Sequence, residues 1–157
     1  MTCRCEVLML LFAPVLFGGC GDRVRLDVPL MPRESLSDEE KIAFILNDVW
    51  LGMESRRIYK VLAHVSPGYR DQEGRDYAAI QEYLSEIFKE YGEVKITRMR
   101  PLIAVHGDRA RALETFGTIA RPRDPRRMAP LNLQGQVYVY FERVGGAWKI
   151  VEWSPIL

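Results

Sequence analysis

The chain has 157 residues, of which 48% are hydrophobic and 27% charged, and its formal net charge at pH 7 is +1. A charge balance this close to zero argues against a nucleic-acid-binding protein, so we expect no nucleic-acid partner. The length and the apolar fraction are sufficient for one domain of ordinary size to fold around its own core.

Residues 1–19 have the three parts of a secretory signal peptide. Arg4 lies in the short first part, the apolar centre runs from Val7 to Phe17, and the small residues Gly18 and Gly19 follow. The apolar stretch is shorter than the roughly 20 residues that a helix needs to span a bilayer. We therefore expect this leader to be removed.

The residues from Leu16 to Cys20 resemble the lipobox, the signal that bacterial lipoprotein signal peptidase reads. The resemblance implies that Cys20 becomes the acylated first residue of the mature protein, and that its lipid, palmitate included, holds the chain on a membrane. It also implies a location in the bacterial cell envelope, with the domain in the periplasm or elsewhere outside the cytoplasm. Two alternatives stay open: an ordinary secretory signal with an unrelated cysteine, and an uncleaved anchor.

Cysteine usage agrees with this interpretation, because Cys3 and Cys5 lie inside the leader. A mature chain that starts at Cys20 would have one acylated cysteine and no disulfide, so we expect the core alone to stabilise the domain. Residues 20–36 contain two prolines and no helical period, which predicts a tether between lipid and domain. The alternative is an edge strand built from Val24, Leu26, Val28 and Leu30.

The domain, residues 37–157, begins with three predicted helices. Ser37 and Glu40 form a capping box at the start of the first. Its apolar face consists of Ile42, Ile45, Leu46, Val49, Trp50 and Met53. The second is predicted over Arg56–Val65 and stops before Pro67. The third begins after Asp76 as N-cap and ends at Gly92, which we expect to be a left-handed cap.

From Val94 onward, apolar residues recur at every second position, which predicts strands. Val94–Val105 and Arg109–Ala120 are expected to form one hairpin, and Leu131–Arg143 and Trp148–Trp153 a second. The proline-rich segment Arg121–Pro130 between them is expected to be a loop. Three helices followed by four long antiparallel strands predict an α+β domain, with the helices packed on one face of a curved sheet of four strands or slightly more.

This order of elements resembles the nuclear transport factor 2-like superfamily, whose cystatin-like fold is shared by ketosteroid isomerase and by polyketide cyclases such as SnoaL. The resemblance is carried by Leu62–Gly74, Gly107–Ala110 and Gly145–Ile150, and it covers nearly all of residues 37–157. It implies a cone-shaped cavity between the concave sheet face and the helices, and frequent dimerisation through the convex face. It does not imply one function, because the same cone serves enzymes, ligand binders and scaffolds.

Asp71 follows the second helix, where the isomerases of this superfamily place a catalytic aspartate that moves a proton next to a carbonyl. The resemblance therefore makes Asp71 a candidate general base. The partners that stabilise the oxyanion in those isomerases do not carry over. The first helix has Asn47 and Trp50 but no tyrosine, and the strand before the last has Tyr138 and Tyr140 but no aspartate. A solvated loop acid or a turn residue is the alternative interpretation of Asp71.

Strand alternation points to two further acids. The residues that share a face are Ala110, Ala112, Glu114 and Phe116 in one strand, and Trp148, Ile150 and Glu152 in another. If both faces line the cavity, Glu114 and Glu152 point into it, where paired carboxylates can do acid–base work or bind a cationic ligand. The alternative is that each is matched across strands by an arginine such as Arg98 or Arg100, or lies at the rim.

The histidines indicate no metal chemistry. His64 and His106 are far apart in the sequence and have no cysteine companions, so we expect no metal site and no cofactor. No serine lies in a nucleophile elbow, and no glycine-rich loop precedes a helix.

A polar and aromatic strip is predicted on one face of the strand Leu131–Arg143. Tyr138 and Tyr140 share this face with Asn132, Gln134 and Gln136. Such a composition is typical of an interface, so we expect a homodimer or a partner surface here, extended by Trp153 of the last strand. An ordinary half-exposed sheet is the alternative.

These features favour a lipid-anchored cell-envelope protein with a non-enzymatic cone domain, which binds a small apolar ligand or a protein partner. The alternative is a ketosteroid-isomerase-like or polyketide-cyclase-like enzyme that uses Asp71 as its general base.

Overall fold

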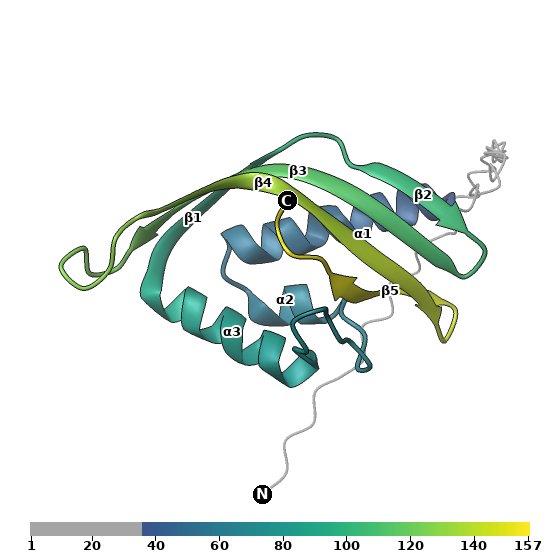
Figure 1. Ribbon diagram of the computed structural model, residues 1–157, viewed down its shortest axis with the longest axis horizontal. Coiled ribbons are helices and arrows are strands. Elements are labelled where there is room, and N and C mark those ends of the chain that lie inside the picture. Colours follow the sequence, from purple (N-terminus) through teal and green to yellow (C-terminus); the bar gives the residue numbers. More distant parts are fainter. Residues whose placement is uncertain (1–35) are drawn as a thin grey trace, which may run out of the picture. The chain divides into compact units, whose positions relative to one another are not determined.

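The computed structural model describes residues 36–157. In this part of the chain, three helices pack on the inner face of one curved antiparallel sheet, whose strands arch over them (Figure 1). The predicted α+β class and the arrangement of helices on a curved sheet are confirmed. None of the described helices is long and apolar enough to cross a membrane. The predicted leader, Cys20 and the tether up to residue 35 lie outside the described residues.

The first helix, α1, spans Asp38–Glu54 and has the predicted capping box. The Ser37 hydroxyl accepts a hydrogen bond from the Glu40 amide at 3.2 Å, and the Glu40 carboxylate accepts one from the Ser37 amide at 2.8 Å. These contacts satisfy backbone donors that the start of a helix leaves free. The apolar face of α1 is buried through Ile42, Ile45, Leu46 and Val49.

The second helix, α2, is shorter than predicted: it spans Ile58–Leu62 rather than Arg56–Val65. Before its start, Arg56 has a left-handed φ of 55°, which a right-handed helix cannot contain. After its end, the amides of His64 and Val65 donate to carbonyls three residues back, both at 3.1 Å. This tighter turn brings the chain to the last strand, where Val65 pairs with Ile150.

The third helix, α3, spans Tyr77–Glu90 and begins as predicted, because the Asp76 carboxylate accepts a hydrogen bond from the Ala79 amide at 2.9 Å. Its predicted end is wrong. Tyr91 is already extended, with φ −99° and ψ 126°, and Gly92 lies inside the first strand rather than in a left-handed cap. The helix therefore passes directly into the sheet without a glycine turn.

The strands are β1 (Tyr91–Arg98), β2 (Leu102–His106), β3 (Arg109–Pro122), β4 (Leu131–Val144) and β5 (Ala147–Trp153), in the order β1, β3, β4, β5, with β2 also paired with β3. The single predicted strand Val94–Val105 is thus two strands. Pro101 lies at the break and has no amide to donate to a ladder. β1 pairs with the C-terminal half of β3, residues 116–122, and β2 pairs with its N-terminal half, residues 109–113.

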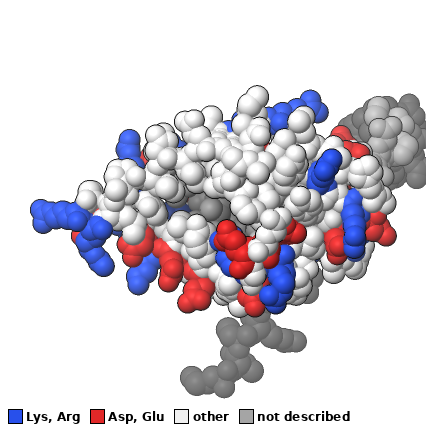
Figure 2. Space-filling view, viewed as in Figure 1, with Lys and Arg blue, Asp and Glu red and all other residues white. Residues whose placement is uncertain are grey.

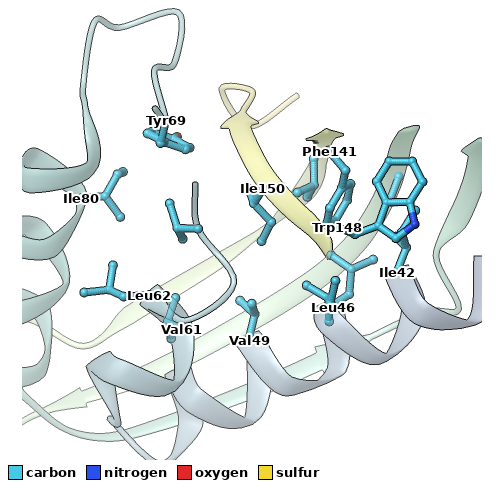
Figure 3. Close-up of a cluster of buried hydrophobic side chains, with 14 of the residues drawn as sticks. Ile42, Leu46, Val49, Val61, Leu62, Tyr69, Ile80, Phe141, Trp148 and Ile150 are labelled. Atoms are coloured by element: carbon cyan, nitrogen blue, oxygen red, sulfur yellow. The ribbon is translucent and has the colours of Figure 1, made fainter. Parts of the chain in front are cut away.

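The core lies between the inner sheet face and the helices (Figure 3). Alternate residues of β3, β4 and β5 meet the apolar faces of α1, α2 and α3, which is the pattern of a sheet buried on one side. The strand residues in this cluster are Ala110, Ala112, Val137, Val139, Phe141, Trp148 and Ile150. A second, smaller cluster of Tyr91, Val94 and Ala120 lies at the far end of the sheet, beside α3. Over the arch of the sheet the surface is mostly uncharged, while charged side chains gather at the lower rim and the ends (Figure 2).

A β-bulge in β5 reverses the predicted sheet faces of Glu152 and Trp153. Phe141 pairs with Ile150, but Tyr140 pairs with Glu152, so Val151 is an extra residue in β5. Beyond a bulge the alternation of side chains is reversed. Glu152 therefore lies on the outer side with Tyr140 and not on the inner side with Ile150. Trp153 pairs with Val139, packs against the main core and does not extend the tyrosine face.

Candidate functional site

The inner face carries one deeply buried acid, Glu114 on β3. Ala110, Ala112 and Glu114 are all buried on this face, as the alternation predicted. Glu114 is only 2% exposed, and its Oε1 accepts a hydrogen bond from Trp50 Nε1 of α1 at 2.6 Å. The Trp50 ring also packs on Phe116, with ring centroids 5.6 Å apart. Strand alternation predicted the inward-facing Glu114, but nothing local predicted Trp50 as its donor, because 64 residues separate the two.

Burial raises the pKa of the Glu114 carboxyl above its ordinary value, while the hydrogen bond from Trp50 and the charge of Arg98 act in the opposite direction. Arg98 itself is hydrogen-bonded to Asn47 of α1. A carboxyl in this environment can hold a proton at a pH where an exposed glutamate has lost it. It can therefore donate a hydrogen bond to a ligand or exchange a proton with one.

The raised pKa makes a prediction about Glu114→Gln. Between the ordinary value of 4.5 and the raised pKa, the folded protein holds a proton that the unfolded chain has lost, so the wild type loses stability as the pH rises through this window. We expect the Gln variant to lack this loss. Urea unfolding of both proteins from pH 4 to pH 8 tests this prediction. The free energy of unfolding of the variant should rise relative to that of the wild type as the pH rises. Parallel profiles over the whole range contradict it.

The predicted pair of inward acids is wrong. Glu152 lies beyond the bulge, on the opposite face of the sheet from Glu114, and its carboxylate accepts a hydrogen bond from Gln72 Nε2 at 3.0 Å. One carboxylate cannot assist the other through the sheet. Of the two predicted inward acids, Glu114 is therefore the one that remains on the inner face.

Asp71 lies in the loop between α2 and α3, where four donors surround its carboxylate. Oδ1 accepts from the amides of Glu73 at 3.0 Å and Arg75 at 2.9 Å, and Oδ2 accepts from Arg75 Nε at 2.7 Å and the Tyr69 hydroxyl at 3.2 Å. Burial opposes ionisation, but these donors, Arg75 above all, hold the pKa of Asp71 below its usual value. This carboxylate organises a loop. A general base needs a free oxygen at a substrate, and the geometry does not provide one here.

His64 belongs to a small polar cluster around Asp48 that was not predicted from the sequence. Its Nε2 lies 2.8 Å from Asp48 Oδ2 on α1, and Lys60 Nζ lies 2.8 Å from the other oxygen of Asp48. His106 is exposed at the end of β2. Within residues 36–157, no three side chains of His, Cys, Asp or Glu are grouped so that they could hold a metal ion.

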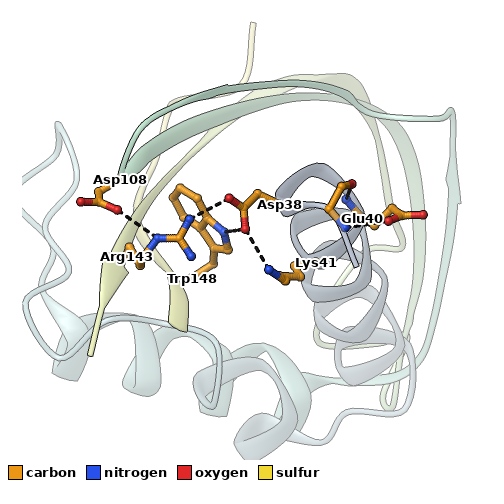
Figure 4. A network of polar contacts seen from close by, with 7 residues as sticks. Asp38, Glu40, Lys41, Asp108, Arg143 and Trp148 are labelled. Carbon is orange, nitrogen blue, oxygen red and sulfur yellow. Dashed lines mark hydrogen bonds and ion pairs between the residues drawn. The ribbon is translucent and has the colours of Figure 1, made fainter. Parts of the chain in front are cut away.

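A second network joins the start of α1 to the hairpin of β4 and β5 (Figure 4). Asp38 accepts hydrogen bonds from Arg143 Nη2 at 2.7 Å, Trp148 Nε1 at 3.1 Å and Lys41 Nζ at 3.0 Å. The Trp148 hydrogen bond, followed by those of Arg143 and Lys41, holds the pKa of Asp38 well below its usual range. The Arg143 guanidinium also stacks on the Trp148 ring, 4.4 Å from its centroid, and reaches Asp108 at 3.0 Å.

The outer face of the sheet carries the predicted tyrosines. Tyr138 and Tyr140 are half-buried neighbours with ring centroids 6.2 Å apart, and the Arg111 guanidinium lies 5.9 Å from the Tyr138 centroid. An open groove of about 420 Å³ lies on the same sheet, beside the break between β1 and β2. Its lining includes Thr97, Met99, Thr115, Gly117, Ile119 and Gln134. This groove was not predicted from the sequence, because β1 and β2 were expected to form one continuous strand.

Solved structures show the same arrangement of helices and sheet. A nuclear transport factor 2-like superfamily protein from Salmonella enterica serovar Typhimurium has a TM-score of 0.62 at 17% identity, covering 74% of this chain and 87% of that chain. This likeness decides the fold. The chain has the nuclear transport factor 2-like cone fold. No family model matches the sequence, and no curated protein is significantly similar to it.

Two structures with this cone fold are named as enzymes. A candidate scytalone dehydratase from Novosphingobium aromaticivorans has a TM-score of 0.65 at 16% identity, covering 74% of this chain and 80% of that chain. A hexachlorocyclohexane dehydrochlorinase, LinA type 2, has a TM-score of 0.63 at 11% identity, covering 74% of this chain and 82% of that chain. At these identities the likeness is one of fold, and the side chains of the present cone have to carry any functional argument.

Proposed function

We propose that the protein is a cell-envelope lipoprotein, anchored through acylated Cys20, whose cone domain binds a partner without transforming it. The anchor is supported by the lipobox-like residues Leu16 to Cys20 at the end of the leader. A tether of residues 20–36 would keep the cone within reach of the membrane surface. The domain would then act outside the cytoplasm.

The observation that carries the binding role is the outer face of the sheet. The paired rings of Tyr138 and Tyr140 and the groove at Gly117 lie on this face, and Arg111 lies beside both rings. Tyrosine and arginine are enriched in protein interfaces and among the residues that carry most of the binding energy. A second copy of the chain is the partner that we propose for this face.

The enzyme alternative, an isomerase or cyclase with Asp71 as base, has less support. All four donors around Asp71 come from its own loop, and the isomerases' oxyanion partners are missing from α1 and β4. Glu114 is the better placed acid, because it is buried beside Trp50 on the inner face. A small apolar ligand on that face would meet a hydrogen-bonding carboxyl, which fits binding as well as chemistry.

Native mass spectrometry of the full chain, extracted from bacterial membranes in detergent, tests the proposed partner. The wild type should give the mass of two chains, and the double variant Tyr138→Ala/Tyr140→Ala the mass of one. Tyr59→Ala is the matched control, because Tyr59 is an 81% exposed tyrosine on α2 and should leave the dimer intact. The proposal would be contradicted if the wild type, like the double variant, gave only the mass of a single chain.

A further inference from the structure

The segment Ser154–Leu157, which follows β5, is held along the edge of β4. The Ser154 amide donates to the Tyr138 carbonyl at 2.9 Å, and the Leu157 amide donates to the Gln136 carbonyl at 2.9 Å. The Ser154 hydroxyl in turn accepts a hydrogen bond from the Tyr138 amide at 2.9 Å. The ladder of β5 ends opposite Val139, so this segment continues the pairing of the β4 edge in irregular form.

Gly135 makes a place for the side chain of Ile156. Gly135 pairs with Phe116, so both lie on the inner face of the sheet. A Cβ at position 135 would overlap Cγ2 of Ile156, and it would lie 3.2 Å from the Leu157 carbonyl oxygen. The absence of a side chain at Gly135 is thus what admits a branched aliphatic group to the inner face, next to Phe116.

The segment is loosely held. Ile156 is 46% exposed and Leu157 is 69% exposed, so neither side chain contributes the full burial energy of a core residue. A few hydrogen bonds and one half-buried side chain oppose its release. Elements with so few buried contacts are the ones that open at low free-energy cost.

We propose that the β4 edge from Gly135 to Tyr138 is a strand-docking site, which holds Ser154–Leu157 in the free protein and takes an extended, aliphatic peptide of a partner protein in its place. Main-chain groups of Gln136 and Tyr138 would pair with any extended peptide, and the space over Gly135 selects an aliphatic side chain. This inference rests on the proposed binding role, but it concerns a site distinct from the outer tyrosine face. Because Ser154–Leu157 is part of the same chain, it occupies the site at a high effective concentration. A peptide of a partner protein has to compete with it for the site.

The chain's own sequence supplies the probe. A fluorescent peptide Glu-Trp-Ser-Pro-Ile-Leu, the sequence of residues 152–157, is titrated into the full chain in detergent. Ile156→Asp should release the segment Ser154–Leu157 from the site, because burying a charged side chain against an apolar surface is costly. The substitution changes no residue of the sheet. We expect this variant to bind the peptide at least about tenfold more tightly than the wild type does, because the competing segment is removed. A peptide with aspartate in place of its isoleucine should not bind.

Two glycine variants, each combined with Ile156→Asp, locate the site. Gly135→Ala should abolish peptide binding, because its Cβ takes the place of the isoleucine side chain. Gly92→Ala is the matched control on β1, where the atom nearest to an added Cβ is Arg123 Cγ at 3.4 Å, and it should leave peptide binding unchanged. If Gly135→Ala does not fold, Ser154→Ala replaces it: loss of the Ser154 hydroxyl should raise the wild-type chain's affinity for the peptide.

The outcomes separate this inference from the proposed function. Equal peptide affinity in the wild type and Ile156→Asp, or binding that survives Gly135→Ala, overturns the strand-docking site. If the Tyr138-dependent dimer persists in that case, the proposed function stands alone. If the wild type forms no dimer, the proposed function fails, whatever the peptide titration shows.

Discussion

Replacing Trp148 by alanine is expected to lower the free energy of unfolding by about 3–5 kcal/mol, the range for removing a large aromatic side chain from a core. Trp148 is 4% exposed and belongs to the main core with Phe141 and Ile150. Its indole also donates to Asp38 and supports the stacked Arg143 guanidinium, so alanine would leave a cavity and release the start of α1 from the sheet.

Urea unfolding followed by circular dichroism measures this loss. Trp148→Phe is the control, because it keeps most of the buried ring and removes the donor to Asp38. We expect it to retain most of the stability that the alanine variant loses. If the free energy of unfolding of Trp148→Ala lies within about 1 kcal/mol of the wild-type value, Trp148 does not link α1 to the core.

Asp71→Ala is expected to lower the free energy of unfolding by about 2–3 kcal/mol. Breaking a buried ion pair usually costs about 3–5 kcal/mol, and the smaller figure applies because the Arg75 side chain keeps 35% exposure and can turn to water. The variant also leaves the Tyr69 hydroxyl without its acceptor in the core. Glu73→Ala is the control, since this exposed partner of Arg75 should change stability by about 0.5 kcal/mol or less.

The pH dependence of this effect has a definite sign. The pKa of Asp71 is lowered in the folded protein, so its stabilisation is complete above the ordinary carboxyl range and is lost as the pH falls through the lowered value. The stability difference between the wild type and Asp71→Asn should therefore be constant from about pH 5 to pH 7 and shrink below about pH 4. A difference that grows toward low pH would contradict the bonding described for this loop.

Local patterns allowed much of this fold to be predicted. The capping box of Ser37 and Glu40, the N-cap at Asp76 and the inner face of β3 depend on residues close in sequence, and all three were confirmed. The bulge at Val151 was not predicted, because it is a shift in the β4–β5 pairing that β5 alone does not reveal. The break before Leu102 did have a local signal, since Pro101 cannot donate to a ladder, but the alternation of apolar residues on both sides of it predicted one strand. Alternation in β5 alone gave no sign that Glu152 and Trp153 exchange faces.

The site was predicted only in part, for a related reason. Glu114 was identified by strand alternation, whereas its environment depends on Trp50, a residue of another element. Asp71 was named through resemblance, but the resemblance contained no information about Arg75 and Tyr69, which occupy its oxygens. The contacts from Asp38 to Arg143 and Trp148 span 105 and 110 residues of sequence and have no local signature.

The most direct test of the lipoprotein assignment is the intact mass of the full chain extracted from bacterial membranes, with wild type and Cys20→Ala measured side by side. The wild type should lack residues 1–19 and carry the added mass of acyl chains on Cys20, while Cys20→Ala should carry no lipid and keep its leader. A wild-type mass that includes the leader, or that shows no added lipid, would contradict the proposal that this cone is a membrane-anchored binding protein.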